Sequence, residues 1–148
     1  MRVDFYILES ASPSGRLQFA CRLTEKAYGL DNKVYAHTAT ATDAQMLDDL
    51  LWTFRQGSFV PHACVGQELE GNSATASGAP VRIGTPEASD ASGDLLINLA
   101  DAVPEFVDEF ERVAESVGGD EAAVKAGRAR FKQYRDRGIE PVTHKISG

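Results

Sequence analysis

Short apolar runs alternate with amphipathic helical patterns along the first half of the chain. The run Val3–Leu8 ends at a proline-containing turn, and a helical pattern follows it and ends near Gly29. A second run, 34–36, precedes a helix whose apolar residues recur at i, i+1, i+4, i+5 and i+8 between Met46 and Phe54. Strands that alternate with helices of this length favour an α/β domain with a mostly parallel sheet flanked by helices.

Two further runs in the second half of the chain predict strands. They are 80–84 and Leu95–Leu99, and a surface loop rich in Gly, Ser and Ala is expected before them at 66–78. Leu95–Leu99 is nearly all apolar, as strands covered on both faces are. The pattern of 102–117 fits either one long helix or a short helix followed by a strand near 112–117.

Capping residues mark the ends of two helices. Thr42 and Gln45 resemble a capping box at the start of the second helix. Asp120 is a suitable cap for a final helix, which we expect to run to a stop at Gly138. The segment 139–148 is too short to be assigned.

Length and composition favour one domain, 1–148, that needs no metal ion or disulfide to fold. The contents of hydrophobic residues (43%) and charged residues (25%) are near the averages for globular domains. Cys21 and Cys64 lie far apart without CxxC spacing, so we expect free thiols. No apolar run approaches the roughly 18 residues that a bilayer requires. Residues 1–5 lack the apolar core of a signal peptide, so we expect a cytoplasmic protein with no membrane partner.

Charge is unevenly distributed along the chain. The net charge of −7 argues against a protein whose whole surface grips nucleic acid. Residues 121–137 nevertheless carry a local balance of +4, because six of the fifteen Lys and Arg residues lie there beside Glu121 and Asp136. The six are Lys125, Arg128, Arg130, Lys132, Arg135 and Arg137. A basic surface on an acidic body suggests a defined anionic partner.

The sequence carries no motif for a cofactor, a metal or catalysis. The two junctions where a strand meets a helix, 10–16 and 37–42, contain neither GxGxxG nor GxxxxGK[ST]. His62 and Cys64 lie in an expected loop, and a thiolate needs a base presented from elsewhere in the fold, so a structural loop is favoured. The histidines and cysteines lack zinc-ligand spacing. An α/β nucleotide binder or enzyme with a degenerate phosphate loop stays as the alternative function.

The segment that follows the second helix is unusually aromatic. Trp52 lies off the helix's apolar stripe, and Phe59 and Val60 fall in a loop after Gly57. Large apolar groups outside a periodic core often anchor protein interfaces. The alternative, a loop that folds its aromatic side chains over the core, fits the pattern nearly as well.

The final helix carries the most distinctive pattern. Arg128, Phe131, Lys132 and Arg135 are related by i, i+3, i+4 and i+7, which places them on one face, and Lys125 extends this face by one turn. The pattern alone slightly favours a core ring beneath a solvated basic stripe. The functional interpretation is a slot for a short acidic and apolar peptide, because a guanidinium binds a carboxylate in bidentate fashion while the ring packs a side chain.

Several motifs in order along the chain resemble one family, the chi subunit of the bacterial DNA polymerase III holoenzyme. They are FYIL, LLWTF, GSFVPHACVG, PVRIG, DLLINL and AGRARFKQYRDRG. The resemblance implies a Rossmann-like α/β fold without a dinucleotide site or an active site of its own. It also favours the helix-then-strand interpretation of 102–117.

The resemblance implies a non-catalytic replication adaptor with two protein partners. One is the psi subunit, through which chi joins the clamp loader. The other is single-stranded DNA-binding protein, whose acidic C-terminal tail ends in a phenylalanine carboxylate, so that contact with nucleic acid is mainly indirect. The positions that match the psi-facing surface are Trp52, Phe59, Val60, Pro61 and His62.

The tail-binding positions of the family carry over to the final helix and the residue before it. The matching residues are Val117, Arg128, Phe131, Lys132 and Arg135. Phe131 stands where a tyrosine is familiar, so a hydroxyl contact is missing. Position 124 is Val where the family can present a lysine, and the neighbouring Lys125 is included in the candidate site.

Overall fold

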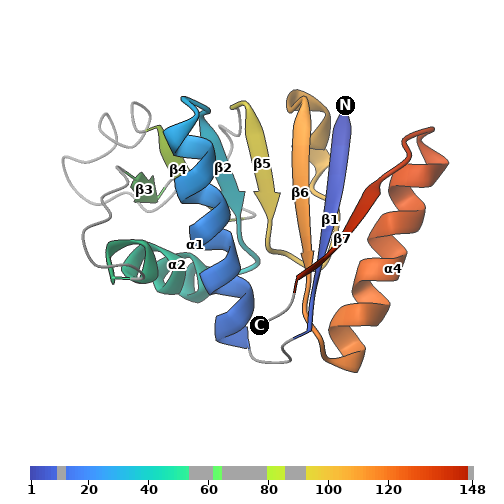
Figure 1. Ribbon diagram of the computed structural model, residues 1–148, viewed down its shortest axis with the longest axis horizontal. Coiled ribbons are helices and arrows are strands. Elements are labelled where there is room, and N and C mark those ends of the chain that lie inside the picture. Colours follow the sequence, from blue (N-terminus) through green and yellow to red (C-terminus); the bar gives the residue numbers. More distant parts are fainter. Residues whose placement is uncertain (10–12, 54–61, 65–79, 86–92, 147–148) are drawn as a thin grey trace.

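A computed structural model describes residues 1–9, 13–53, 62–64, 80–85 and 93–146. Its strands form one seven-stranded sheet in the order β3-β4-β2-β5-β6-β1-β7 (Figure 1). The strands are β1 (Arg2–Leu8), β2 (Val34–His37), β3 (His62–Cys64), β4 (Val81–Gly84), β5 (Leu95–Asn98), β6 (Arg112–Val117) and β7 (Val142–Ile146). The helices are α1 (Pro13–Gly29), α2 (Ala41–Thr53), the 3-10 helix η1 (Glu105–Glu109) and α4 (Glu121–Asp136). Every neighbouring pair of strands runs parallel, which confirms the predicted fold class.

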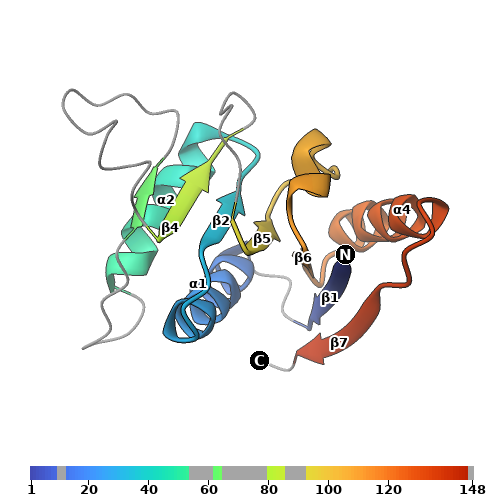
Figure 2. The same cartoon turned by 90° about the horizontal axis from the view of Figure 1, so that it is seen from above.

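The sheet is covered on both faces, and Figure 2 shows α1 and α4 on opposite sides of it. Leu95 and Ile97 of β5 pack with α1 and α2 in one hydrophobic cluster. Leu96, between them, packs in the second cluster with residues of η1 and α4. Because successive strand residues point to opposite faces, a strand covered on both sides is apolar throughout.

The start of α2 differs from the sequence prediction. The backbone N–H of Asp43 donates to the Thr40 hydroxyl at 3.1 Å, so Thr40 caps the helix and Thr42 lies inside it. Gln45 donates its side-chain amide to Asp49 at 3.0 Å, instead of closing a capping box. Met46 is 47% exposed although its spacing placed it on the apolar stripe. The buried face of α2 is made by Ala44, Leu47 and Leu51.

The segment 102–117 forms a short 3-10 helix and a strand, as the family resemblance favoured. Strand β6 lies between β5 and β1 in the interior of the sheet. Val113 and Val117 pack in the cluster beneath α4, and Ala114 packs in the cluster beneath α1 and α2. Glu115 therefore shares the face of Val113 and Val117, and it is opposite Asn98 on one side and Phe5 on the other.

Two strands that the sequence did not predict form the edges of the sheet. Residues 62–64, expected as loop, are β3, and the unassigned segment 139–148 contains β7. Strand β3 is too short to display a period of two, and β7 is largely exposed and so shows no apolar pattern. The predicted loop 66–78 lies outside the described residues. None of the described helices combines the length and apolar character that a membrane span requires.

Candidate functional site

Helix α4 separates a buried side from an exposed side. Gly127, Arg130 and Tyr134 are its buried residues, whereas Arg128 and Arg135 are exposed. The helix begins after Asp120, as predicted, although the Asp120 side chain makes no capping hydrogen bond. The i, i+3, i+7 spacing of the buried residues places them on one face towards the sheet.

Gly127 brings α4 unusually close to β6. A Cβ atom at this position would lie 2.7 and 3.0 Å from the two γ carbons of Val117. These distances are shorter than the roughly 3.5 to 4.0 Å at which carbon atoms normally pack. The absence of a side chain at Gly127 therefore allows Val117 to sit directly beneath the helix.

An apolar hollow lies between α4 and the strands beside Val117. It has a volume of about 370 Å³. Its lining residues come from β1, β6, α4 and β7: Phe5, Ile7, Val117, Val124, Gly127, Arg128, Phe131 and Thr143. Arg128 is the only charged residue among them, so the hollow suits an apolar side chain with an anionic group at one edge.

A second, cationic hollow of about 460 Å³ lies along the exposed side of α4. It is lined by Arg128, Phe131, Lys132, Arg135 and Asp136. Arg128 and Phe131 line both hollows, so the two adjoin. We call the pair the α4 groove.

Phe131 lies at the junction of the two hollows and is half-buried. Its ring packs edge-on against Phe5 with 5.2 Å between the centroids. The ring therefore packs on the core, as one interpretation of its spacing expects, and it also lines the groove.

The α4 groove brings together five of the six residues assigned to tail binding. They are Val117, Arg128, Phe131, Lys132 and Arg135. Lys125 is exposed on α4 but lines neither hollow. Val124, at the position where the family can present a lysine, instead lines the apolar hollow. The structure thus gathers side chains that the helical period had placed on one face.

The residues assigned to psi are described only in part. Trp52, near the end of α2, has a side chain that is 50% exposed. His62 begins the edge strand β3. Phe59, Val60 and Pro61 lie outside the described residues.

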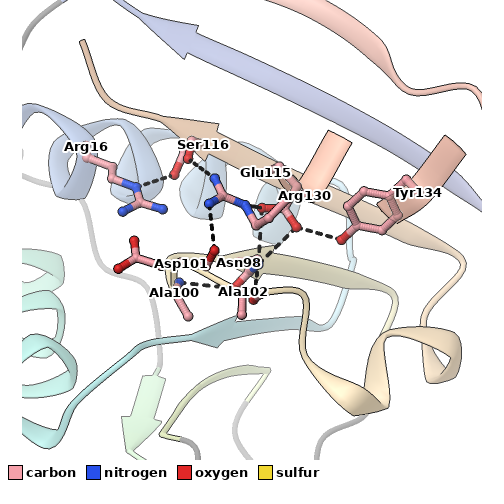
Figure 3. Close-up of polar contacts among 9 residues, drawn as sticks. All are labelled: Arg16, Asn98, Ala100, Asp101, Ala102, Glu115, Ser116, Arg130 and Tyr134. Atoms are coloured by element: carbon pink, nitrogen blue, oxygen red, sulfur yellow. Dashed lines mark hydrogen bonds and ion pairs between the residues drawn. The ribbon is translucent and has the colours of Figure 1, made fainter. Parts of the chain in front are cut away.

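A buried polar cluster, which the sequence did not reveal, anchors α4 to the sheet (Figure 3). Glu115 of β6 accepts a hydrogen bond from Arg130 Nε at 2.8 Å and another from the Tyr134 hydroxyl at 2.6 Å. The Asn98 side-chain amide donates to both carboxylate oxygens of Glu115, at 3.1 and 3.0 Å. Arg130 had been counted with the basic surface, but its side chain is only 2% exposed. It therefore adds no charge to the groove.

Two side chains extend this cluster around the end of β6. The Arg130 guanidinium also donates to the backbone carbonyls of Ser116 and Asp101, both at 3.1 Å. Arg16 of α1 donates from Nε to the Ser116 hydroxyl at 2.8 Å. Burial and the neighbouring charge of Arg130 lower the pKa of Arg16. Figure 3 shows both guanidinium groups at the Ser116 end of the strand.

Burial dominates the electrostatics of the cluster. It raises the pKa of Glu115, and this effect is opposed by the charge of Arg130 and by the hydrogen bonds from Tyr134, Asn98 and Arg130. Burial and the nearby Glu115 raise the pKa of Tyr134, so its hydroxyl keeps the proton that it donates. A signal was present in the sequence, because Glu115 is a carboxylate in a strand whose other residues on the same face, Val113 and Val117, are apolar, but its partner Arg130 lies fifteen residues away.

The two sites differ in what they can contact. Glu115 and Tyr134 have no exposed surface, so a substrate cannot reach them in this conformation. The α4 groove is open and presents three cationic side chains beside apolar surface. Within the part of the chain that the structure describes, no group of His, Cys, Asp or Glu is arranged to hold a metal ion. The arrangement suits the binding of an acidic and apolar ligand.

Comparison with known proteins assigns the family. A protein-family model described as DNA polymerase III chi subunit, HolC, matches residues 1–142. The chain belongs to the DNA polymerase III chi subunit family. The match confirms the resemblance carried by the sequence motifs, and it makes the chain a replication accessory protein of the polymerase III complex.

Three relatives named DNA polymerase III subunit chi match this chi-family chain over nearly their whole length. The one from Pseudomonas aeruginosa is 42% identical over 145 residues, which are 98% of this chain and 96% of the relative. The one from Haemophilus influenzae is 30% identical over 144 residues, 97% and 96% of the two chains. The one from Escherichia coli is 29% identical over 140 residues, 91% of each.

Solved structures of other proteins share the fold. The chi-family chain is similar to the crystal structure of T4 UvsW, with a TM-score of 0.67 and 8% identity over 99% of this chain and 41% of that chain. It is also similar to S. cerevisiae Dbp5 bound to RNA and ADP BeF3, with a TM-score of 0.63 and 18% identity over 97% and 41% of the two chains. The chain thus spans about two fifths of each structure, and such low identity relates the folds alone.

Proposed function

We propose that this chi-family chain is a non-catalytic adaptor in the cytoplasm that binds the acidic C-terminal tail of single-stranded DNA-binding protein and links it through psi to the clamp loader. The observation that carries the proposal is the α4 groove, in which an apolar hollow adjoins a cationic one. Membership of the chi family supports a replication role but does not by itself identify either partner.

The chemistry of the groove matches the chemistry of the tail. The apolar hollow suits the ring of a terminal phenylalanine, and Arg128, which lines both hollows, suits its carboxylate. Lys132 and Arg135 then lie in the cationic hollow, where the acidic residues of the tail would pass. Guanidinium groups bind carboxylates through short, charge-assisted hydrogen bonds, and Phe131 offers the ring without a tyrosine's hydroxyl.

Calorimetric titration with the tail peptide tests this proposal. A hydrogen bond to a charged group contributes on the order of 1.5 to 3 kcal/mol, so Arg128→Ala should weaken binding by roughly tenfold or more. Arg22→Ala is the matched control, because Arg22 is an exposed arginine on α1, across the sheet from α4. Added salt should weaken the wild-type complex, since the cations of the groove are exposed.

Two further experiments test the link to psi and the alternative function. Co-expression with psi should yield a complex that still binds the tail peptide, because Trp52 and the α4 groove lie on different elements. Nucleotides titrated in parallel should not bind. Equal affinity of wild type and Arg128→Ala for the peptide would refute the assignment of the groove, and nucleotide binding without peptide binding would favour the degenerate phosphate-loop alternative.

A further inference from the structure

Three groove residues of α4 directly follow a residue buried against the sheet. The pairs are Gly127 with Arg128, Arg130 with Phe131, and Tyr134 with Arg135. Successive residues of an α-helix are about 100° apart around its axis. Any rotation of α4 about this axis would therefore turn the groove residues by the same angle as the buried ones.

The fully buried residues of α4 are a glycine, an arginine and a tyrosine. The apolar side chains of Val124 and Phe131 also pack against the core, but each is only partly buried. Hydrophobic burial is non-directional, whereas hydrogen bonds require particular distances and angles. The rotation of α4 is thus fixed in part by its polar contacts with the sheet.

Glu115 provides two of these contacts, about one helical turn apart. One of its carboxylate oxygens accepts from Arg130 at 2.8 Å and the other from Tyr134 at 2.6 Å. The carboxylate itself is held from below, because the Asn98 amide donates to both oxygens. Asn98 is fixed in turn by hydrogen bonds with the backbone of Ala100 and Ala102.

One anchored residue, Tyr134, contacts a ring that lines the groove. The ring of Phe5 packs against the rings of Tyr134 and Phe131, with 5.9 and 5.2 Å between the respective ring centroids. Val117, two residues beyond Glu115 on the same face of β6, lines the apolar hollow. A change at the carboxylate would therefore alter the place of Phe131 over Phe5 and of Arg128 between the hollows.

We infer that Glu115 is a positioning residue, which fixes the rotation of α4 through Arg130 and Tyr134 and so determines which side chains form the α4 groove. The inference rests on the proposed function, because its measured consequence is the affinity for the tail peptide. Glu115 itself does not touch the ligand in this account.

Tyr134→Phe tests the inference with the loss of a single hydroxyl. Substitutions that act on a site without touching its ligand change coupling by a factor of about 2 to 30, so we expect the peptide affinity to fall about fivefold. Ile97→Val is the matched control, since Ile97 is buried on the α1 and α2 side of the sheet. Loss of its methylene destabilises a core to about the same degree as loss of one hydrogen bond. Its affinity should be unchanged.

Arg130→Lys is a second variant that keeps a positive charge beside Glu115. A lysine lacks the planar guanidinium that reaches the carbonyls of Ser116 and Asp101, so peptide affinity should fall here too. Each affinity is measured by calorimetry at a temperature at which circular dichroism shows the variant fully folded. Thermal unfolding of the same samples reports stability separately.

Three results would overturn the inference. If wild type fails to bind the peptide, the proposed function falls and this inference with it. If Arg128→Ala weakens binding but Tyr134→Phe and Arg130→Lys do not, the proposed function stands and the positioning role is refuted. If Ile97→Val weakens binding as much as Tyr134→Phe, affinity follows stability, and Glu115 has a structural role only.

Discussion

Gly127→Ala should destabilise the protein, although alanine is normally the better residue inside a helix. In an exposed helix the exchange gains about 1 kcal/mol. At Gly127 the new Cβ would lie 2.7 and 3.0 Å from the two γ carbons of Val117. Contact distances of about 3.5 to 4.0 Å then require a displacement of roughly 1 Å.

The surroundings of Gly127 offer little room for that displacement. Val117 is β-branched and contacts the site with both methyl groups, so no rotation of its side chain clears them together. Its strand, β6, is held between β5 and β1. Overpacking of this kind costs about 1 to 3 kcal/mol, which exceeds the helical gain and leaves a net loss of about 1 kcal/mol.

In a double-mutant cycle with Val117→Ala, the effect of Gly127→Ala on the free energy of unfolding should change sign. Without the two γ carbons, the nearest remaining atom of residue 117 is its Cβ at 3.4 Å. In the Val117→Ala background, Gly127→Ala should therefore stabilise the protein by up to about 1 kcal/mol. Urea unfolding measures both steps, and a coupling of about 2 kcal/mol is expected for residues in contact. The same sign in both backgrounds would refute the steric argument.

Two further predictions concern buried titratable groups. His37 is buried with its Nδ1 lacking a hydrogen-bond partner among the described residues, and burial lowers its pKa. The unfolded chain then binds a proton at higher pH than the folded chain does, so stability should fall as the pH drops below about 6.5. The fall should be smaller in His37→Gln, and urea midpoints at several pH values would measure it. Burial raises the pKa of the Cys21 thiol to about 12. In a Cys64→Ser variant, a thiol reagent should label Cys21 only after unfolding, and rapid labelling of the native protein would contradict its burial.

The sequence placed several residues of the α4 groove on one helical face, but it did not reveal the contacts that hold the helix against the sheet. The period of α4 placed Arg128, Phe131 and Lys132 on one face, because helical spacing is a local property of the chain. Arg130 looked like a member of the same basic stripe, since its partner Glu115 comes from another element and pairs with it only in the folded protein. Strand β7 was missed because an exposed edge strand needs no apolar period.

Helix capping shows the same limit at shorter range. Thr40 and Thr42 are both acceptable capping residues, and each has a plausible acceptor role at the start of α2. The helix begins at Ala41, which places Thr40 at the cap and leaves Thr42 as a helical residue. Residue type does not decide between two such positions, and helix ends assigned from a sequence pattern vary by one or two residues.

Among the described residues, the ends of β5 and β6 are closed by contacts with the buried side of α4, whereas the α4 groove lies on its exposed side. In parallel α/β sheets, ligands commonly bind beyond the carboxyl ends of the strands. Here Asn98 at the end of β5 and Glu115 near the end of β6 are bonded to one another and covered by Arg130 and Tyr134. Their hydrogen-bonding groups are therefore committed to the fold, and breaking one would leave another buried and unpaired at considerable cost.

The α4 groove is therefore also sensitive to changes in the buried contacts of Arg130 and Tyr134 with Glu115. The residues that close the end of the sheet and the residues that line the groove alternate along the same helix, so neither set can shift without the other. An exposed substitution such as Arg128→Ala removes one contact and leaves the buried face intact. A buried substitution such as Tyr134→Phe replaces no residue that lines the groove and changes only the positions of those residues. Peptide affinity and stability measured for both kinds of variant would therefore separate the residues that contact the ligand from those that position α4.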